Sequence, residues 1–315
     1  MSPRALVSRR RMLQSGAAFA LGAVAPGEPA AAETTPSMVD GTFLAIGDWG
    51  RGNATQRQVA AGMARVAEEQ PIGFVISTGD NFYKGGVKST DDRLWKQFFE
   101  DVYSSPSLAV PWYPVLGNHD HKGNAMAQVA YSQMSARWSM PGPYYWRAVR
   151  LQDGSNADLF FLDTTRFVAK SRGIRRYLAA RNLAALKDNQ IAWLEQALAT
   201  SKARWKIVIG HHPLFSSGKH GSTGVLIRLL QPLFERYGVS VYLNGHDHDL
   251  QHVVVNGINY VTSGAGASPR PTGSMQGTRF ASSEPGFLRG RLSRIGIEIE
   301  FIGASGARLY SATLA

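Results

Sequence analysis

The 315-residue sequence contains no cysteine. This absence excludes a disulfide-stabilised scaffold, a zinc site built on thiolates and a cysteine nucleophile. The sequence also lacks the composition of a disordered chain, because 44% of its residues are hydrophobic and only 18% are charged. Its length is sufficient for one large or two ordinary domains with a hydrophobic core.

Acidic residues are in the minority, and this imbalance bears on possible partners. The chain has 34 Lys and Arg against 23 Asp and Glu, which gives a formal net charge of +11. A basic chain favours an anionic partner, such as nucleic acid, a membrane surface or a phosphorylated substrate. No nucleic-acid-reading motif or clustered aromatic platform accompanies the charge, so we do not expect nucleic-acid binding.

Residues 1–32 have the pattern of an export signal. A start rich in arginine precedes a short uncharged stretch of Ala, Gly and Leu, and the small residues Ala30–Ala32 provide a cleavage site. Ser8–Gln14 (SRRRMLQ) resembles a twin-arginine signal, which predicts export by that machinery to the periplasm or beyond. Cleavage would remove four arginines and one glutamate, so the net charge would fall from +11 to +8.

Short apolar runs alternate with helical patterns along the rest of the chain. Five runs that are rich in β-branched or aromatic residues predict buried strands: Thr42–Gly47, Gly73–Thr78, Trp112–Gly117, Trp205–Gly210 and Val239–Gly245. Helical spacing of apolar residues predicts helices at Ala54–Gln70, Asp92–Tyr103, Asn124–Trp138, Leu183–Thr200 and Gly224–Tyr237. Strands without helices between them are expected at Tyr144–Leu151, Asp158–Asp163, His252–Ser263 and within Gly290–Tyr310.

This order predicts an α/β fold in which two mixed sheets, or one mixed sheet, are flanked by helices. The sequence has no internal repeat and no low-complexity linker. No stretch after the leader is long and apolar enough for a membrane helix. We therefore expect one domain over residues 34–315, without stable membrane insertion after processing.

Each of the five predicted strands ends in a glycine followed by a residue with a metal-binding side chain. The pairs are Gly47-Asp48, Gly79-Asp80, Gly117-Asn118, Gly210-His211 and Gly245-His246. Sites in α/β proteins form beyond the carboxyl ends of strands, so these five turns can converge. His246 and His248 are two apart and can share one face of an extended segment. Any one pair is typical of an ordinary turn, but the whole set predicts a metal site.

These motifs resemble the calcineurin-like metallophosphoesterases. Tyr83, in Gly79–Tyr83 (GDNFY), narrows the resemblance to the purple acid phosphatases, and VPWYPVLGNHDHKGN, GHHPLFS, KHGST and YLNGHDHDLQ are similar to their mammalian-type, tartrate-resistant branch. The resemblance runs from about Thr42 to the C-terminus. It implies a sandwich of two packed mixed sheets flanked by helices, and an acid phosphatase that hydrolyses phosphate monoesters with a metal-bound hydroxide.

The resemblance also implies a binuclear centre. Asp48, Tyr83 and His248 would hold Fe(III), while Asn118, His211 and His246 would hold a divalent ion (Fe, Zn or Mn), and Asp80 would bridge the two. Hard oxygen donors suit trivalent iron, and imidazole and amide donors suit a divalent metal. Two metals at this spacing can clamp a phosphate and activate a water.

Further histidines are candidates for substrate contact. The resemblance implies that His119 contacts phosphate and protonates the leaving group, with Asp120 orienting its ring, and that His220 is a second substrate-facing histidine. We expect His212 to point away from His211, and no specific role is assigned to His121. The segment Thr165–Asp188 is rich in Arg and Lys, which indicates either a solvated helix face or an electropositive rim for anionic substrates.

The expected partners are phosphorylated small molecules or phosphoproteins. A phosphodiesterase or nucleotide hydrolase on the same metal core is the first alternative. An iron redox protein that generates reactive oxygen is the second, although histidines beside the metals argue against it. The family's disulfide strap is absent, because the chain has no cysteine.

Overall fold

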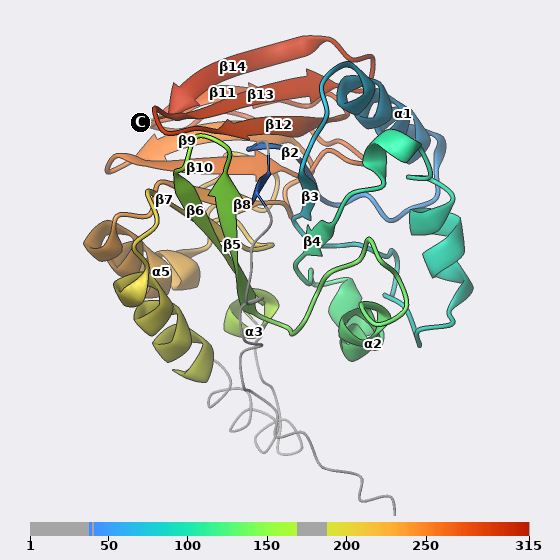
Figure 1. Cartoon of the computed structure of the whole chain (residues 1–315), viewed down its shortest axis with the longest axis horizontal. Helices are drawn as coiled ribbons and strands as arrows, with labels where there is room; N and C mark the ends of the chain where they lie inside the picture. Colours follow the sequence, from blue (N-terminus) through green and yellow to red (C-terminus); the bar gives the residue numbers. More distant parts are fainter. Residues whose placement is uncertain (1–37, 40, 169–187, 315) are drawn as a thin grey trace, which may run out of the picture.

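The computed structural model describes residues 38–39, 41–168 and 188–314 (Figure 1). The predicted export signal and most of the basic segment 165–188 lie outside these residues. Two mixed β-sheets pack against each other, with helices on their outer sides. Among the described residues, no helix has both the length and the apolar character needed to cross a bilayer.

The first sheet has eight strands in the order β1-β5-β6-β7-β8-β10-β9-β11. Its centre, from β6 to β10, is parallel, and β9 and β11 extend one side in antiparallel pairing. The strands are β1 (Met38–Val39), β5 (Tyr145–Leu151), β6 (Asn156–Phe161), β7 (Trp205–Ile209), β8 (Val241–Asn244), β9 (Leu250–Val255), β10 (Ile258–Ser263) and β11 (Thr278–Ser282).

The second sheet has six strands in the order β14-β13-β12-β2-β3-β4. Its strands β2, β3 and β4 are parallel, whereas β12, β13 and β14 are antiparallel to their neighbours. The bounds are β2 (Thr42–Ile46), β3 (Phe74–Ser77), β4 (Trp112–Pro114), β12 (Gly286–Leu292), β13 (Ile297–Gly303) and β14 (Arg308–Leu314).

Helices cover the outer faces of both sheets. Helix α1 (Ala54–Glu69) starts at Asn53, whose side chain accepts a hydrogen bond from the Gln56 N–H, and it buries Val59 and Met63 in the core between the sheets and the helix. Helix α5 (Gly224–Tyr237) and the helical residues 188–200 pack on the side of the first sheet away from the second (Figure 1). The shorter elements are η1 (Trp95–Glu100, a π-helical turn), η2 (Pro106–Leu108), η3 (Asp120–Lys122), α2 (Ala125–Tyr131) and α3 (Thr165–Val168).

The predicted two-sheet α/β architecture is confirmed, with three local differences. Asp92–Tyr103 contains a π-helical turn instead of a regular helix, and α2 ends at Tyr131, well before Trp138. His252–Ser263 was predicted as one strand but forms the hairpin of β9 and β10. Its two-residue turn is Asn256-Gly257, with both residues at positive φ, which is the typical signal for a tight hairpin.

Candidate metal centre

The predicted ligands converge where the two sheets meet. Strands β2, β3 and β4 of the second sheet lead into Asp48, Asp80 and Asn118, and strands β7 and β8 of the first sheet lead into His211 and His246. Parallel strands place their carboxyl ends at one edge of a sheet, and the two sheets present these edges to each other. The sequence prediction that these turns share one site agrees with the interatomic distances below.

A first cluster of donor atoms surrounds the hydroxyl of Tyr83. That oxygen lies 2.9 Å from Asp48 Oδ1, 2.7 Å from Asp80 Oδ2 and 3.2 Å from His248 Nε2. His248 Nε2 is also 3.4 Å from Asp48 Oδ1. One hydroxyl proton cannot satisfy two carboxylate oxygens and a ring nitrogen together, so this arrangement suits a cation.

A second cluster surrounds Nε2 of His211. This nitrogen lies 3.2 Å from Asn118 Oδ1, 3.2 Å from His246 Nδ1 and 3.5 Å from Asp80 Oδ1. Asp80 therefore presents one carboxylate oxygen to each cluster. A carboxylate shared in this way is the geometry of a bridging ligand between two metal ions.

Backbone carbonyls fix which nitrogen of each ligand histidine faces the site. His248 Nδ1 is 2.8 Å from the Ser268 carbonyl, and His211 Nδ1 is 2.9 Å from the Thr78 carbonyl. Because a carbonyl only accepts hydrogen bonds, Nδ1 carries the proton in both rings and Nε2 keeps its lone pair for a metal. The donor set thus fits two metal ions: oxygens with one nitrogen in the first cluster, and imidazoles with an amide oxygen in the second.

Three of the ligand residues have strained backbones. Asp48, Asp80 and His246 have φ angles of 58°, 52° and 70° in the left-handed region, and among the described residues only Asn256 shares this with them outside glycine. Such conformations cost free energy and persist where the surroundings impose them, typically at functional sites. Gly117 is required for close approach, since a Cβ there would lie 2.2 Å from Asp80 Oδ1.

Burial shapes the electrostatics of the centre. Burial and then the charge of Asp80 raise the pKa of Asp48, and burial followed by both carboxylates raises the pKa of Tyr83. Burial, followed by neighbouring histidines, lowers the pKa of His246. A bound cation opposes the first two shifts, because it favours the carboxylate and phenolate forms. The site is therefore expected to gain metals and release protons together.

His119 and His220 lie against opposite parts of the ligand set. The His119 ring centroid is 4.3 Å from that of Tyr83, and the His220 ring centroid is 4.3 Å from that of His246. His119 Nδ1 is 2.7 Å from the Lys84 carbonyl, so Nδ1 donates there, and Nε2 keeps a lone pair that Lys122 Nζ approaches to 3.3 Å. Both histidines therefore lie next to the ligand set, and their contact with substrate stays a prediction.

Asp120 does not orient His119, so that prediction is wrong. Its carboxylate accepts hydrogen bonds from the backbone N–H groups of Gly117, Asn81 and Phe82, and from the Gln128 side chain, over 2.8–3.1 Å. The Asp120 side chain is buried at the start of η3, while its neighbour His119 packs against the ring of Tyr83. Asp120 supports the loops that carry Asp80, Tyr83 and Asn118.

His212 also departs from expectation, because it does not point away from the site. Its ring centroid lies 4.3 Å from that of His246, and its Nδ1 is 3.0 Å from Thr164 Oγ1. The nitrogens of His211, His212 and His246 lie within 4.8 Å of one another. His121 bonds instead to Asp163, at 2.9 Å, and has a structural role. The sequence pattern of two consecutive histidines after a strand, His211 and His212, does not indicate that both rings turn toward the site.

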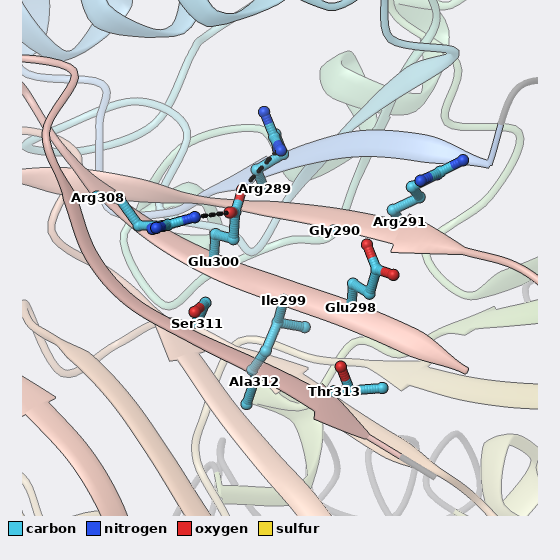
Figure 2. Close-up of a pocket in the computed structure, with 10 residues that line it drawn as sticks. All are labelled: Arg289, Gly290, Arg291, Glu298, Ile299, Glu300, Arg308, Ser311, Ala312 and Thr313. Atoms are coloured by element: carbon cyan, nitrogen blue, oxygen red, sulfur yellow. Dashed lines mark hydrogen bonds and ion pairs between the residues drawn. The ribbon is translucent and has the colours of Figure 1, made fainter. Parts of the chain in front are cut away.

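A separate pocket of about 360 Å³ lies on the outer face of β12, β13 and β14 (Figure 2). Glu300 makes ion pairs with Arg289, at 2.8 Å, and Arg308, at 3.2 Å, across its floor. None of the predicted site residues lines this pocket, so it is distinct from the metal centre.

Comparisons with known proteins agree with this geometry. Residues 41–250 match the family model of calcineurin-like phosphoesterases. Human tartrate-resistant acid phosphatase type 5 is 38% identical over 89% of this chain and 94% of its own length, and purple acid phosphatase 3 of Arabidopsis thaliana is 38% identical over 87% and 78%. The chain belongs to the calcineurin-like phosphoesterase family, as a homologue of the tartrate-resistant and purple acid phosphatases.

Solved structures show the same fold. Plasmodium GAP50, described as the anchor in the inner membrane complex, superposes with a TM-score of 0.74 and 29% identity, over 87% of this chain and 88% of its own. Purple acid phosphatase PPD1 from yellow lupin gives a TM-score of 0.63 at 17% identity, over 89% of this chain and 55% of its own. The predicted fold and family are both confirmed.

Proposed function

We propose that this protein is an acid phosphatase that hydrolyses phosphate monoesters at a binuclear metal centre. The single observation that carries the proposal is the position of Asp80, whose two oxygens face two separate donor clusters. When bound, the two metal ions supply an activated water and neutralise the charge of the phosphate. Side chains of the protein itself bind the substrate and transfer protons.

The donor types suggest which metals the clusters hold. The first cluster has two carboxylates and a phenol with one imidazole, and these hard anionic donors favour Fe(III). The second cluster has two imidazoles and an amide oxygen beside the shared carboxylate, which favours a divalent ion such as Fe, Zn or Mn.

Histidines next to the clusters handle phosphate and protons. His119 can protonate the departing alkoxide from Nε2 when its ring carries both protons, because the Nδ1 proton stays bound to the Lys84 carbonyl. His220 packs against the ring of His246, and there it would contact a phosphate oxygen of the bound substrate. His212 packs on the same ring and adds a third imidazole beside the phosphate position.

The leader supports export as part of the proposal. The arginine-rich start, the short apolar stretch and Ala30–Ala32 fit a cleaved twin-arginine signal, and this route exports proteins that are already folded with their metals. On this proposal, the mature enzyme works in the periplasm or outside the cell. Replacing Arg9 and Arg10 together by lysine should retain the unprocessed chain in the cytoplasm, which fractionation and the mass of the product would reveal.

The decisive experiment is metal analysis combined with pH–rate profiles on a monoester and a diester. We expect two metals per chain, faster turnover of the monoester, and a visible charge-transfer band from Tyr83 to iron that Tyr83→Phe removes. A colourless wild type with iron at full occupancy would contradict the assignment of Tyr83. Faster turnover of the diester would instead support the phosphodiesterase alternative, because the metal core alone does not select the ester.

A further inference from the structure

The loop of residues 215–222, between β7 and α5, carries His220 to the metal centre. Its base is closed by the Thr223 N–H, which donates to the Leu214 carbonyl at 3.0 Å. His220 is exposed to solvent, although its ring centroid lies 4.3 Å from that of the ligand His246. Packing in a core does not fix an exposed side chain, so the position of His220 depends on polar contacts of its loop.

The backbone of His220 is bound by Asp247, the residue between the two ligand histidines of segment 246–248. Asp247 is fully buried, and its Oδ1 accepts a hydrogen bond from the His220 N–H at 2.7 Å. Its Oδ2 accepts a hydrogen bond from the hydroxyl of Ser216, in the same loop. One side chain of the ligand segment therefore binds the 215–222 loop at two points.

The hydrogen bonds around Ser216 have only one direction. Its Oγ accepts from the Gly218 N–H at 3.0 Å and from Gln251 Nε2 at 2.9 Å. Both lone pairs of this oxygen are then in use, so the hydroxyl proton goes to Asp247. Both carboxylate oxygens of Asp247 are therefore needed as acceptors. An asparagine there would direct its NH2 group at the hydroxyl of Ser216 or at the N–H of His220.

Two glycines let the backbone come into direct contact with Asp247. A Cβ at Gly218 would lie 2.6 Å from Asp247 Cγ, and a Cβ at Gly264 would lie 2.0 Å from the Asp247 carbonyl oxygen. Both distances are too short for a real Cβ atom, so only glycine permits this approach. The 215–222 loop is thus packed closely against Asp247 as well as bonded to it.

A second contact reaches the ring of His220. Arg270 Nη1 lies 3.0 Å from His220 Nε2, in an exposed hydrogen bond. Water competes with a bond of this kind, whereas the bond from the His220 N–H ends on a buried carboxylate, where the low dielectric strengthens it. The contact with Asp247 therefore contributes more to the position of His220 than the contact with Arg270.

We propose that Asp247 is a positioning residue for the phosphatase reaction, which fixes the 215–222 loop so that the ring of His220 stays against His246. This inference rests on the proposed function, in which His220 contacts the phosphate. Because Asp247 belongs to the same short segment as two metal ligands, a single carboxylate sets the position of the substrate-facing ring relative to the metals. Small displacements of such a group slow a reaction strongly.

Trypsin reports the state of the loop directly, because Lys219 is exposed and precedes His220 in the sequence. Cleavage within a native loop follows the population of its opened form. We expect metal-loaded Asp247→Asn to be cut after Lys219 about tenfold faster than the wild type, which is the factor for losing one hydrogen bond to a charged group. Mass spectrometry of the fragments identifies the cut.

Asp249→Asn is the matched control for damage to the ligand segment. Asp249 is also buried and also adjacent to the ligand His248. Its carboxylate oxygens accept from Gln251 Nε2 at 2.8 and 2.9 Å, and asparagine keeps one of these acceptors. This variant should keep the cleavage rate and the metal content of the wild type. Equal acceleration of cleavage in Asp247→Asn and Asp249→Asn would overturn the proposal.

Steady-state rates connect the loop to the reaction. At equal metal content, kcat/KM for phenyl phosphate should fall about tenfold or more in Asp247→Asn. In a His220→Ala background the same change should have less than about a twofold effect, because the loop no longer carries a ring to position. Equal factors in the two backgrounds, or an unchanged rate of cleavage after Lys219, would contradict the positioning role.

Ser216→Ala provides the same test if Asp247→Asn does not fold, because Ser216 is not next to a ligand in the sequence. It removes one donor to Asp247, so cleavage after Lys219 should accelerate, by less than in Asp247→Asn because the His220 N–H keeps its acceptor. An unchanged cleavage rate would again count against the proposal. If the wild type hydrolysed no phosphate ester, the proposed function would fail, while the cleavage rates still tested whether Asp247 fixes the loop.

Discussion

Replacing Asp120 by alanine tests the structural role that the geometry assigns to this buried carboxylate. The change removes the acceptor for three backbone N–H groups, those of Gly117, Asn81 and Phe82, and for the side chain of Gln128. Each buried donor left unpaired costs about 1–3 kcal/mol. Three backbone donors therefore give a loss of at least about 3 kcal/mol, which corresponds to a fall of roughly 6–12 °C in melting temperature for a domain of this size.

Loss of metal should accompany the loss of stability, because these N–H groups belong to the loops that carry Asp80 and Asn118. Thermal unfolding and metal analysis of Asp120→Ala, Asp120→Asn and the wild type provide the assay. The asparagine variant should lie between, since it keeps one acceptor oxygen. Asp91→Asn, at a fully exposed carboxyl, is the matched control and should change neither quantity. This reasoning would be refuted if Asp120→Ala had the melting temperature and metal content of the wild type but turned over slowly. That result would instead support a role of Asp120 in catalysis through His119.

Two further predictions concern stability. Chelation of the metals should lower the melting temperature by roughly 5–10 °C, because a ligand at 100 times its Kd contributes about 2.7 kcal/mol, and Asp80→Ala should show no such response to the chelator. His252, which bonds to Tyr310 and Asn259, has its pKa lowered mainly by burial, so the folded state binds fewer protons than the unfolded state. Stability from this residue is present above its unfolded pKa of about 6.5 and is lost as the pH falls below it. The free energy of unfolding, measured at several pH values, should fall less on acidification in His252→Gln than in the wild type. An equal fall in both proteins would contradict the role given to His252.

The ligand set was predictable because its signal is local. A strand that ends in glycine followed by Asp, Asn or His places that side chain at the carboxyl edge of the sheet, whatever the rest of the fold. Asp80 and His246 then adopt a left-handed backbone that such a turn provides. Parallel strands bring the same ends together within each sheet, so the sequence predicts two groups of ligands, and packing of the two sheets brings these groups together.

The supporting side chains could not be predicted in the same way. Asp120 and His119 are adjacent in sequence, but the direction of each side chain depends on the turn η3, which begins at Asp120, and a pattern of residue types does not encode this turn. His212 lies against His246 because β7 and β8 are neighbours, which is a tertiary fact. The loops after β2 and β10 are joined by hydrogen bonds from Asn53 to Ala267 and from Gly266 to Gly47, and nothing in the local sequence of either loop indicates this contact.

The centre joins two sheets, and this explains how its ligands are divided. Asp48, Asp80 and Asn118 extend from the second sheet, whereas His211 and His246 extend from the first. Among the predicted ligands, Asp80 is the one whose two carboxylate oxygens face the two donor clusters. Its carboxylate therefore connects a loop of the second sheet with His211 of the first sheet. Packing of the sheets thus sets the separation of the clusters, and the aromatic and aliphatic core between them determines the geometry of the site as much as the ligands do.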